Sequence, residues 1–583
     1  MQFDSLLQRV LEFGADKLSI GRGEILFRQG DPGDDMFLVL SGRLRVVRDL
    51  GGGAERVVGE VGRGEPVGET AVLGECERGA TVIAIRRTEL VRISAEAFQF
   101  LRNESPGDLV DLIRITALRL KRSYESGSPD PLPSCIAVVP TNGAAPLDEY
   151  CARFVEVLRV SGRDCVHLRS SDLPAELAGG QGDGHALAGW LNEQEASAET
   201  VVLQPDGELT DWSRRCLRQA DLVLLLGQVG SDPTPGPLEA ALEGASEPVA
   251  RPRIDLILLQ ESEPYVGTEA WLAPRSVHRH YHVRPDSLED RARLRRLLVG
   301  EDTNLVLGGG GARGLTHIGA LRAFEELGLP IDRVGGTSIG AVIGAWVARG
   351  ADWRTIAEEL RAHFVDGGSM RSLTLPAISI DTGKRYIGAL EKMFGDAQIE
   401  DLPINYFCVS CNLSRARVIA HRSGLLADWV GASISVPGVA PPYVLGGDLL
   451  VDGGVLNNLP LDIAGRDGSG RLIGVDVSSD IDLTLPPDYN GRPGAWEVLR
   501  SWLPTSGGDK KLPGMLAVLS RVSMLSSTSN VERSRHQADL LIRMPVNGFK
   551  MFDWECIDEL IELGYQTALD HLRPFLDGGS SGE

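Results

Sequence analysis

The stretch LGGGGARGLTHIGAL, residues 307–321, places a run of glycines directly before an apolar pattern with helical spacing. The preceding residues 303–308, TNLVLG, read as a short strand, so the run joins a strand to a helix. Within it, residues 309–314 match G-x-G-x-x-G. Such a loop offers backbone N–H groups to negative charge at a helix start. We therefore expect it to hold either the phosphate of a nucleotide or the oxyanion of a reaction.

The next strand-to-helix turn decides between these two roles. A dinucleotide-binding domain would place an acidic residue at the end of its second strand, to hold a ribose. Here the strand DRVGGTS (332–338) leads into Gly336-Thr337-Ser338-Ile339-Gly340, which is G-x-S-x-G. A strained nucleophile elbow requires small residues two positions before and after its serine. We interpret Ser338 as a nucleophile and the glycine run as its oxyanion loop, with a dinucleotide site as the weaker alternative.

A serine nucleophile needs a general base. His317 is the nearest histidine in sequence, but it lies one turn into the helix after the glycines, where packing or capping suits it as well. Asp452 lies in LVDGGVLNNLP (450–460), where it ends an apolar strand and precedes two glycines. An aspartate of ordinary pKa, about 4, is a weak base, and partial burial raises that pKa. Asp452 is the predicted base.

These segments together resemble the motifs of the patatin-like phospholipases, and ASISVPGVAPP (432–442) is similar to the segment before that family's aspartate. The resemblance implies a three-layer α/β hydrolase fold and a Ser–Asp dyad that acts without histidine. We expect Arg313 to fix the glycine loop, and no metal to be required. The implied site comprises the dyad Ser338 and Asp452, the oxyanion loop Gly309, Gly310, Gly311, Arg313 and Gly314, the elbow glycines Gly336 and Gly340, and the pair Gly453 and Gly454.

Other segments resemble the neuropathy target esterase-like subgroup, including its bacterial members: LNEQE (191–195), LTDWSRRCLRQADLVLLLG (209–227) and VERSRHQADLLIRMP (531–545). In that subgroup a middle α/β region and a C-terminal tail flank the patatin core, and lysophospholipids are the substrates. The resemblance implies a lysophospholipase or phospholipase that meets its substrate at a membrane or micelle surface. The alternative is a cyclic-nucleotide-responsive regulator or scaffold with an inactive hydrolase fold. The intact serine, aspartate and glycine run argue against inactivity.

Residues 20–95 consist of short alternating runs between turns, which predicts a β-barrel or sandwich. GDPGDDMFLVLSGRLRVV (30–47) and VGETAVLGECERGATVIA (67–84) resemble the cyclic-nucleotide-binding β-roll. The resemblance implies that a glutamate holds the ribose 2′-hydroxyl and that the fork of an arginine pairs with the cyclic phosphate. It places five residues in the phosphate cassette: Gly68, Glu69, Arg78, Gly79 and Ala80. Gly79 lacks a hydroxyl, which favours cAMP over cGMP as a regulatory ligand.

From residue 135 onward, short apolar runs alternate with helical stretches, which is typical of a parallel α/β sheet. DLVDLIRITALRLKRSYES (108–126) has helical spacing, and GSPDPLPS (127–134) reads as a linker. We therefore expect a multidomain α/β chain. Its expected parts are a β-roll with a C-terminal helix (1–126), a linker (127–134), a middle α/β domain (135–300), a patatin-like core (303–465) and a C-terminal extension (466–575).

The composition limits the classes of partner. At 583 residues the chain needs several cores, and its net charge of −22 supplies no basic surface for nucleic acid. An α/β domain, rather than a basic helix-turn-helix, follows the β-roll, so a transcription factor is excluded. The eight scattered cysteines and the absence of a signal peptide predict reduced thiols in a cytoplasmic protein. No segment resembles a membrane span, so we expect any membrane contact to be peripheral.

Overall fold

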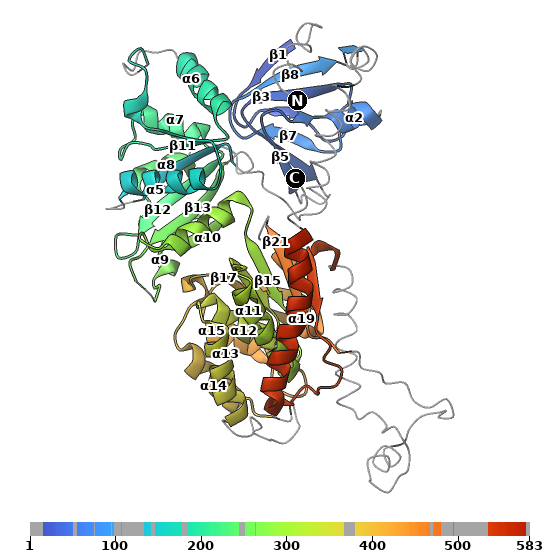
Figure 1. The fold of residues 1–583 in the computed structure, drawn as a ribbon. Helices are drawn as coiled ribbons and strands as arrows, with labels where there is room; N and C mark the ends of the chain where they lie inside the picture. The colour runs from blue at the N-terminus through green and yellow to red at the C-terminus, as the bar shows by residue number, and fades with distance from the viewer. Residues whose placement is uncertain are drawn as a thin grey trace. The chain divides into compact units, whose positions relative to one another are not determined.

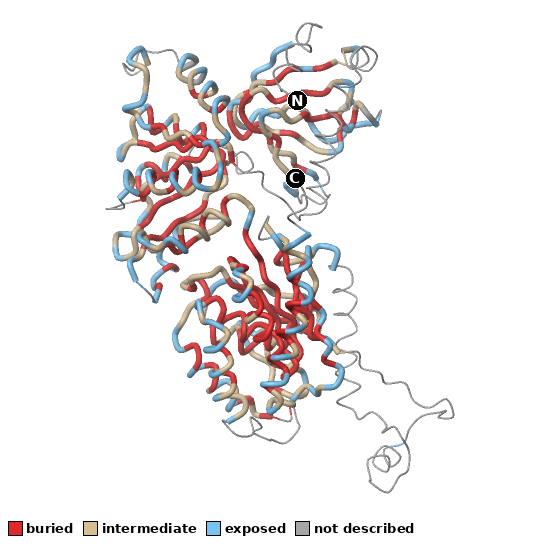
Figure 2. The backbone as a smooth tube through the Cα atoms, in the orientation of Figure 1, coloured by how far each residue is buried: buried red, intermediate tan, exposed pale blue. Residues whose placement is uncertain are grey.

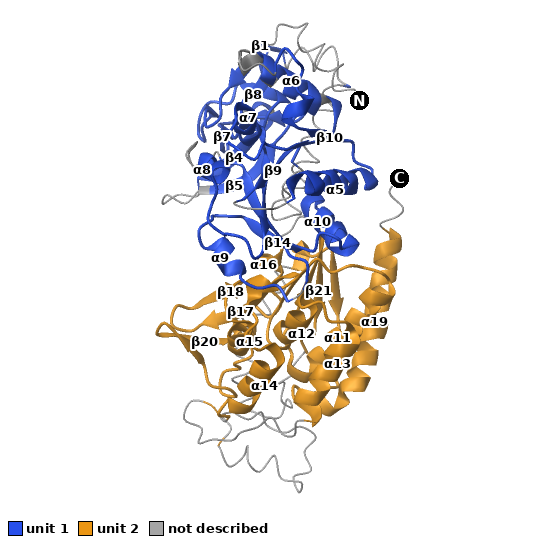
Figure 3. Ribbon diagram, turned by 90° about the vertical axis from the view of Figure 1, so that its left-hand side faces the viewer, with its two compact units in different colours: residues 1–301 blue, residues 302–583 orange. Residues whose placement is uncertain are grey.

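The computed structural model forms two compact units, Met1–Glu301 (unit 1) and Asp302–Glu583 (unit 2), which Figure 3 distinguishes by colour. The predicted helix at 108–126 lies outside the described residues, and so does the predicted linker from residue 127 to residue 132. The structure describes residues 16–49, 55–74, 76–94, 96–97, 107, 133–141, 146–177, 184–243, 251–262, 264–366, 379, 381–466, 470–479, 494 and 535–578.

Unit 1 begins with a β-roll of two four-stranded antiparallel sheets, ordered β1-β8-β3-β6 and β2-β7-β4-β5 (Figure 1). Buried apolar residues of both sheets, such as Val39, Leu44 and Val82, pack together between them. The predicted β-rich N-terminal fold is confirmed. Its elements are β1 Asp16–Ile20, β2 Ile25–Phe27, β3 Asp35–Ser41, β4 Leu44–Asp49, β5 Glu55–Val61, β6 Pro66–Val67, α2 Glu69–Gly74, β7 Thr81–Ala84 and β8 Thr88–Ser94.

The second part of unit 1 is a six-stranded, fully parallel sheet of order β10-β11-β9-β12-β13-β14. Alternate residues of β9 enter opposite cores: Ile136 and Val138 face α5 and α10, whereas Ala137 and Val139 pack with α6 to α9. The sheet is therefore covered on both faces, as its apolar strands predict. The elements are β9 Cys135–Pro140, α5 Leu147–Val160, β10 Cys165–Leu168, η1 Ser170–Asp172, α6 Gly184–Ser197, β11 Thr200–Leu203, α7 Asp211–Gln219, β12 Leu222–Gln228, α8 Pro237–Glu243, β13 Arg253–Leu259, α9 Thr268–Leu272, β14 Arg279–Val283 and α10 Leu288–Val299.

Buried ion pairs join the β-roll to this α/β domain. Arg86 Nη1 lies 2.6 Å from Glu195 Oε1, and Arg86 Nε lies 2.9 Å from Asp221 Oδ1. Arg43 Nη1 reaches Asp221 Oδ2 at 3.2 Å, and all four residues are buried. A buried pair costs desolvation on both sides, so such a cluster fixes which surfaces fit together more than it adds net stability.

Unit 2 contains a mixed sheet of order β19-β20-β17-β16-β15-β21-β22, with β18 paired to β17. Strands β15, β16, β21, β22 and the first half of β17 are parallel, whereas β18 and β20 pair antiparallel with the second half of β17. The parallel strands all end at one edge, where two strand-to-helix turns meet. The strands are β15 Thr303–Leu307, β16 Arg333–Gly336, β17 Asn405–Asn412, β18 Arg417–His421, β19 Tyr443–Leu445, β20 Asp448–Asp452, β21 Arg471–Asp476 and β22 Leu540–Arg543.

Helices cover both faces of this sheet, and the buried residues are concentrated between the layers (Figure 2). The larger core packs α11, α12, α15 and α19 on one face, and the smaller core packs α16 on the other. The expected three-layer fold is confirmed. The elements are η3 Gly311–Leu315, α11 Thr316–Glu326, α12 Ile339–Ala348, α13 Trp353–Leu360, η4 Arg361–Asp366, α14 Lys384–Phe394, η5 Ile399–Asp401, α15 Leu426–Ser433, η6 Gly453–Val455, α16 Leu461–Ala464, η7 Arg535–Gln537, η8 Trp554–Cys556 and α19 Ile557–Gly578.

Candidate active site

Ser338 lies on the turn between β16 and α12 and has φ 56° and ψ −123°. A non-glycine residue at positive φ is strained, and the surrounding packing must hold it there. Two glycines make the turn possible. A Cβ at Gly340 would lie 2.2 Å from the carbonyl oxygen of Leu307, and one at Gly336 would lie 2.4 Å from the Gly340 backbone. The elbow thus requires glycine at both positions for steric reasons.

Asp452 is the last residue of β20, and its carboxylate accepts a hydrogen bond from the side chain of Ser338. The Gly454 amide donates to Asp452 Oδ1 at 2.7 Å. Asp452 is 5% exposed, and burial raises its pKa to about 6, although both hydrogen bonds favour the ionised form. This carboxylate can therefore accept a proton near neutral pH more readily than an exposed aspartate.

The glycine loop between β15 and η3 lies directly beside Ser338. A Cβ at Gly309 would lie 3.0 Å from the Ser338 Cβ, so only glycine permits this approach. The Gly309 amide already donates to the Asn458 carbonyl at 3.2 Å, which removes it from the set of predicted oxyanion donors. The amides of Gly310 and Gly311 have no hydrogen-bond partner among the described residues. These two N–H groups are available to a developing negative charge.

The other residues singled out near the loop support it from behind. Buried Arg313 donates through Nη1 to the Ser479 hydroxyl and so ties η3 to the segment after β21. Gly314 packs against Ile339 at the start of α12, where a Cβ would lie 2.2 Å from Cγ2. His317 is fully buried, its Nε2 is 2.8 Å from the Gly308 carbonyl, and burial lowers its pKa to about 4. It is placed to hold the loop.

Two further polar residues complete the site, and neither of them was predicted from the sequence. Asn458 donates through Nδ2 to the Gly309 carbonyl at 2.9 Å and to Ser478 Oγ at 3.2 Å. Ser433, at the end of α15, accepts a 3.0 Å hydrogen bond from the Ser338 amide. The pair Asn457-Asn458, which begins five residues after Asp452, is a usable signal for the first, because buried amides need partners. Nothing in the local pattern marked Ser433.

The geometry supplies the three groups that acyl transfer requires: an activated hydroxyl, a base and backbone donors to an oxyanion. Within the described ranges, no three His, Cys, Asp or Glu side chains gather closely enough to hold a metal ion. The buried thiols of Cys408 and Cys411 lie on β17, and burial raises the pKa of each to about 12. They are unreactive at neutral pH.

The phosphate cassette of the β-roll has a different arrangement. Arg78 is 6% exposed and donates through Nη1 to the Gly68 carbonyl at 2.9 Å and through Nη2 to the Asp35 carbonyl at 2.6 Å. Its guanidinium lies 4.2 Å from the centre of the Phe27 ring. A Cβ at Gly68 would lie 2.4 Å from Arg78 Nη1, so this glycine makes room for the arginine. Glu69 is buried at the start of α2, and Gly79 and Ala80 follow the arginine in the turn before β7.

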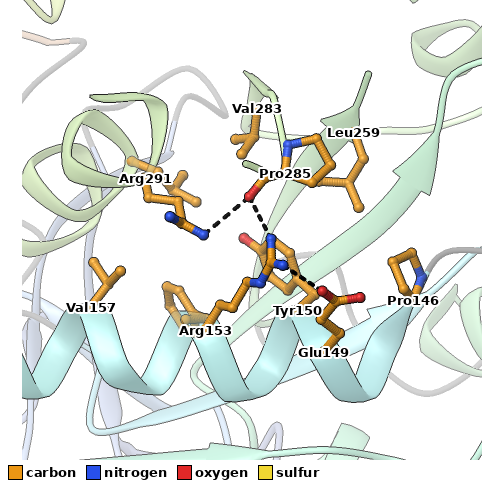
Figure 4. Close-up of a pocket in the computed structure, with 11 residues that line it drawn as sticks. Pro146, Glu149, Tyr150, Arg153, Val157, Leu259, Val283, Pro285 and Arg291 are labelled. Atoms are coloured by element: carbon orange, nitrogen blue, oxygen red, sulfur yellow. Dashed lines mark hydrogen bonds and ion pairs between the residues drawn. The ribbon is translucent and has the colours of Figure 1, made fainter. Parts of the chain in front are cut away.

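A pocket in the α/β domain of unit 1 lies between α5 and the ends of β13 and β14 (Figure 4). Arg153 and Arg291 both donate to the Pro285 carbonyl, at 2.9 Å and 3.1 Å, and Arg153 also pairs with Glu149. The remaining lining is mostly apolar, and the Tyr150 ring rises into the space from α5. It contains no nucleophile beside a base, so Ser338 remains the candidate reaction centre.

Comparison with known families divides the chain into three matching segments. Residues 17–105 match the cyclic nucleotide-binding domain, residues 134–303 the Neuropathy Target Esterase family P-loop like domain, and residues 305–464 the patatin-like phospholipase model. The chain therefore carries these three domains in this order, and the resemblance found in the sequence is confirmed.

Individual relatives match almost the whole chain. The human protein named patatin-like phospholipase domain-containing protein 6 is 32% identical, over 96% of this chain and 44% of its own length. The Aspergillus fumigatus protein named lysophospholipase nte1 is 30% identical, over 99% of this chain and 43% of its own length. The chain thus spans less than half the length of these relatives. Among solved structures, the Thermus thermophilus catabolite activator protein is 26% identical over 27% of this chain and 68% of that chain, with a TM-score of 0.19.

No helix within the described ranges combines the length and apolar character needed to cross a bilayer.

Proposed function

We propose that this chain is a serine esterase that hydrolyses acyl esters of lysophospholipids or phospholipids. The observation that carries the proposal is the Ser338 side chain beside the buried Asp452 carboxylate, together with the Gly310 and Gly311 amides, which have no partner among the described residues. A serine at a strained turn, a carboxylate of raised pKa and two amides without a partner among the described residues together suit acyl transfer.

The proposed reaction has two steps. Asp452 takes the proton from Ser338 Oγ, which attacks the ester carbonyl, while the Gly310 and Gly311 amides stabilise the oxyanion. Collapse of the tetrahedral intermediate breaks the ester bond, Asp452 returns the proton to the leaving alcohol, and an acyl-enzyme remains. Asp452 then removes a proton from water, which attacks the acyl-enzyme and releases a fatty acid. Ser338 recovers its proton as the second intermediate collapses.

The substrate class follows from the relatives, whose names specify phospholipase and lysophospholipase. Such substrates are amphiphiles gathered in membranes or micelles, so the enzyme would act at a lipid surface through peripheral contact. Head-group and chain preference depend on contacts with a bound lipid.

The β-roll is the proposed site for cAMP as a regulatory ligand. Arg78 already donates to the carbonyls of Gly68 and Asp35, which compete with the cyclic phosphate for its guanidinium, so we expect binding to be weak. We also propose the boundaries 1–126, 127–134, 135–300, 303–465 and 466–575 for the β-roll, linker, middle domain, hydrolase core and extension.

An active-site-directed fluorophosphonate tests the esterase proposal against the inactive-scaffold alternative. We expect the full chain to be labelled on Ser338 alone, and the Ser338→Ala variant not to be labelled. Ser414→Ala is the matched control, because it removes an exposed serine and should leave labelling unchanged. A folded wild-type protein that resists the probe at neutral pH would favour the scaffold.

A further inference from the structure

Exposed apolar side chains gather on one edge of unit 2. Leu413, Val444, Leu445 and Leu449 are 50%, 63%, 47% and 41% exposed. The other large apolar side chains exposed in the described part of unit 2 are Ile387 and Phe552. We call the four residues the apolar edge; three belong to the β19–β20 hairpin and one to the β17–β18 turn. Contiguous exposed apolar patches mark surfaces that meet another molecule.

The backbone pairing keeps Val444, Leu449 and Leu413 side by side, whereas Leu445, the next residue of β19, points to the other face of the hairpin. Val444 pairs directly with Leu449 across the hairpin, which turns through Gly446 and Gly447. The Leu413 amide donates to the Leu449 carbonyl at 2.8 Å, and the Leu449 amide donates to Ser414 Oγ at 3.0 Å. Leu450, Val451 and Asp452, the next residues of β20, are all buried, so the strand leaves the surface after Leu449. The edge strand β19 exposes Val444 and Leu445, where a free sheet edge normally carries charge.

The apolar edge is continuous with the candidate active site. Strand β20 runs from the hairpin turn to Asp452, so Leu449 precedes the predicted base by three residues, about 10 Å of extended chain. At the other end of the hairpin, the segment before β19 begins at Ser433, whose hydroxyl accepts from the Ser338 amide. The Asp452 amide also donates to the Ser435 carbonyl at 2.9 Å. Both strands of the hairpin therefore lead to the dyad.

Basic side chains lie beside the apolar edge. Arg415 is exposed in the β17–β18 turn and pairs with Asp448, its Nε 2.8 Å from Oδ2, and exposed Arg417 begins β18. Asp448 offsets the charge of Arg415, which leaves Arg417 as the additional positive group, on a chain whose net charge is −22. Apolar side chains flanked by arginine suit a lipid surface. The apolar side chains can enter the acyl region, while the guanidinium groups bind the phosphate of the head groups.

We propose that the apolar edge docks on a lipid surface and brings the acyl ester to Ser338. The choice of a lipid as the occupant rests on the proposed esterase function, whose substrate resides in such a surface. The hairpin β19–β20 is the inserting element, and the arginine-bearing turn contacts head-group phosphate. Figure 3 shows β17, β18 and β20 together in unit 2.

The test compares the wild type with the double variant Val444→Glu/Leu445→Glu. Binding is measured by co-sedimentation with phosphatidylcholine vesicles, and catalysis with a water-soluble short-chain ester. We expect vesicle binding to fall about tenfold or more, since two apolar side chains no longer leave water. Hydrolysis of the soluble ester should be retained, because neither side chain contacts the dyad. Val160→Glu is the matched control, since it charges an 83% exposed valine on α5 and should leave both readouts unchanged.

Two results would overturn the proposal: a wild type that does not bind vesicles, or a double variant that binds them as well as the wild type does. The second result would place lipid binding on another surface of the molecule. If the soluble ester is not hydrolysed by the wild type, the esterase function fails, while sedimentation still decides the docking role. Retained hydrolysis of the soluble ester by the double variant also shows that it has folded.

Discussion

The hydrolase site in unit 2 and the phosphate cassette in unit 1 both carry family motifs built on glycine and one decisive side chain. At the hydrolase site, glycines bring backbone amides to the serine, and two of those amides remain unpartnered among the described residues. In the cassette, Gly68 makes room for Arg78, and that arginine is already bonded to two carbonyls and stacked on Phe27. The first motif leaves two amides without a partner among the described residues, whereas the arginine of the second already donates to two carbonyls, although its Nε has no partner there.

This difference separates a motif from a prepared site. A preorganised site has its groups aimed and unpaired before the ligand arrives, so binding requires no exchange. An arginine that already donates to carbonyls gains less from a new acceptor that competes with them, because only the difference contributes to affinity. We therefore expect substitutions in unit 2 to change rates greatly, and substitutions in the cassette to change both ligand binding and stability by smaller amounts.

Asp452→Asn should have the largest effect among the supporting residues, lowering kcat by about a thousandfold or more, because the amide cannot accept the serine proton. In the wild type, kcat/KM should fall as the pH drops through about 6, where Asp452 becomes protonated. A pH–rate profile with its acid limb near pH 4 would contradict a buried base.

The same substitution should raise stability at high pH. Burial raises the pKa of Asp452, so its contribution to folding is fully present below the unfolded pKa of about 4 and is lost as the pH rises through about 6. An asparagine has no such dependence. Thermal unfolding at pH 8 should therefore give Asp452→Asn a Tm at least equal to that of the wild type, which also verifies its fold.

Asn458→Ala should reduce kcat about 10- to 100-fold with little change in KM. The substitution removes the Nδ2 bond to the Gly309 carbonyl and leaves the glycine loop less firmly held beside Ser338. Asn412→Ala, a substitution of another buried asparagine of unit 2, is the control. Equal losses of kcat in the two variants would assign Asn458 a general structural role.

Arg78→Lys should weaken cAMP binding by about tenfold, because lysine keeps the charge but loses the two-oxygen fork. Isothermal titration of the full chain measures this, and Arg92→Lys, an exposed arginine of the same roll, is the control. Tight cAMP binding by the wild type, with Kd well below micromolar, would break the contrast between the two sites.

Arg313→Ala should have the smallest effect, a loss of kcat of about three- to tenfold. Arg313 holds η3 to Ser479 from behind the loop and contacts neither Ser338 nor Asp452. Steady-state kinetics with a soluble ester would measure the change. Unchanged activity would show that Gly310 and Gly311 keep their positions without this contact.

The catalytic core could be predicted from the sequence because its backbone requires glycine at particular positions, and the spacing of those glycines is visible in the sequence. Gly336 and Gly340 are required by the tight turn at Ser338, and Gly309 is required by the close approach of its loop to Ser338. The oxyanion donors could be only partly predicted, since the Gly309 amide bonds to Asn458, and that pairing joins residues far apart in the chain. Ser433 could not be predicted for the same reason, because it lies 95 residues from its partner Ser338 in the chain.

Two features of the packing could not be predicted from a local sequence pattern: the buried ion pairs of unit 1 and the exposure of an apolar hairpin in unit 2. The pairing of Arg86 with Asp221 and Glu195 follows from how the β-roll meets the α/β domain, and no periodicity encodes it. The hairpin YVLGGDLL (443–450) could be read from its Gly-Gly turn between apolar runs. Its exposure could not, because apolar residues in a strand normally indicate burial.

The most direct test of the central claim is fatty-acid release from lysophosphatidylcholine micelles by the wild type and by Ser338→Ala. Our account predicts steady release by the wild type and a loss of at least about a thousandfold in a variant that remains folded. Equal release by both proteins would contradict the assignment of Ser338 as the nucleophile.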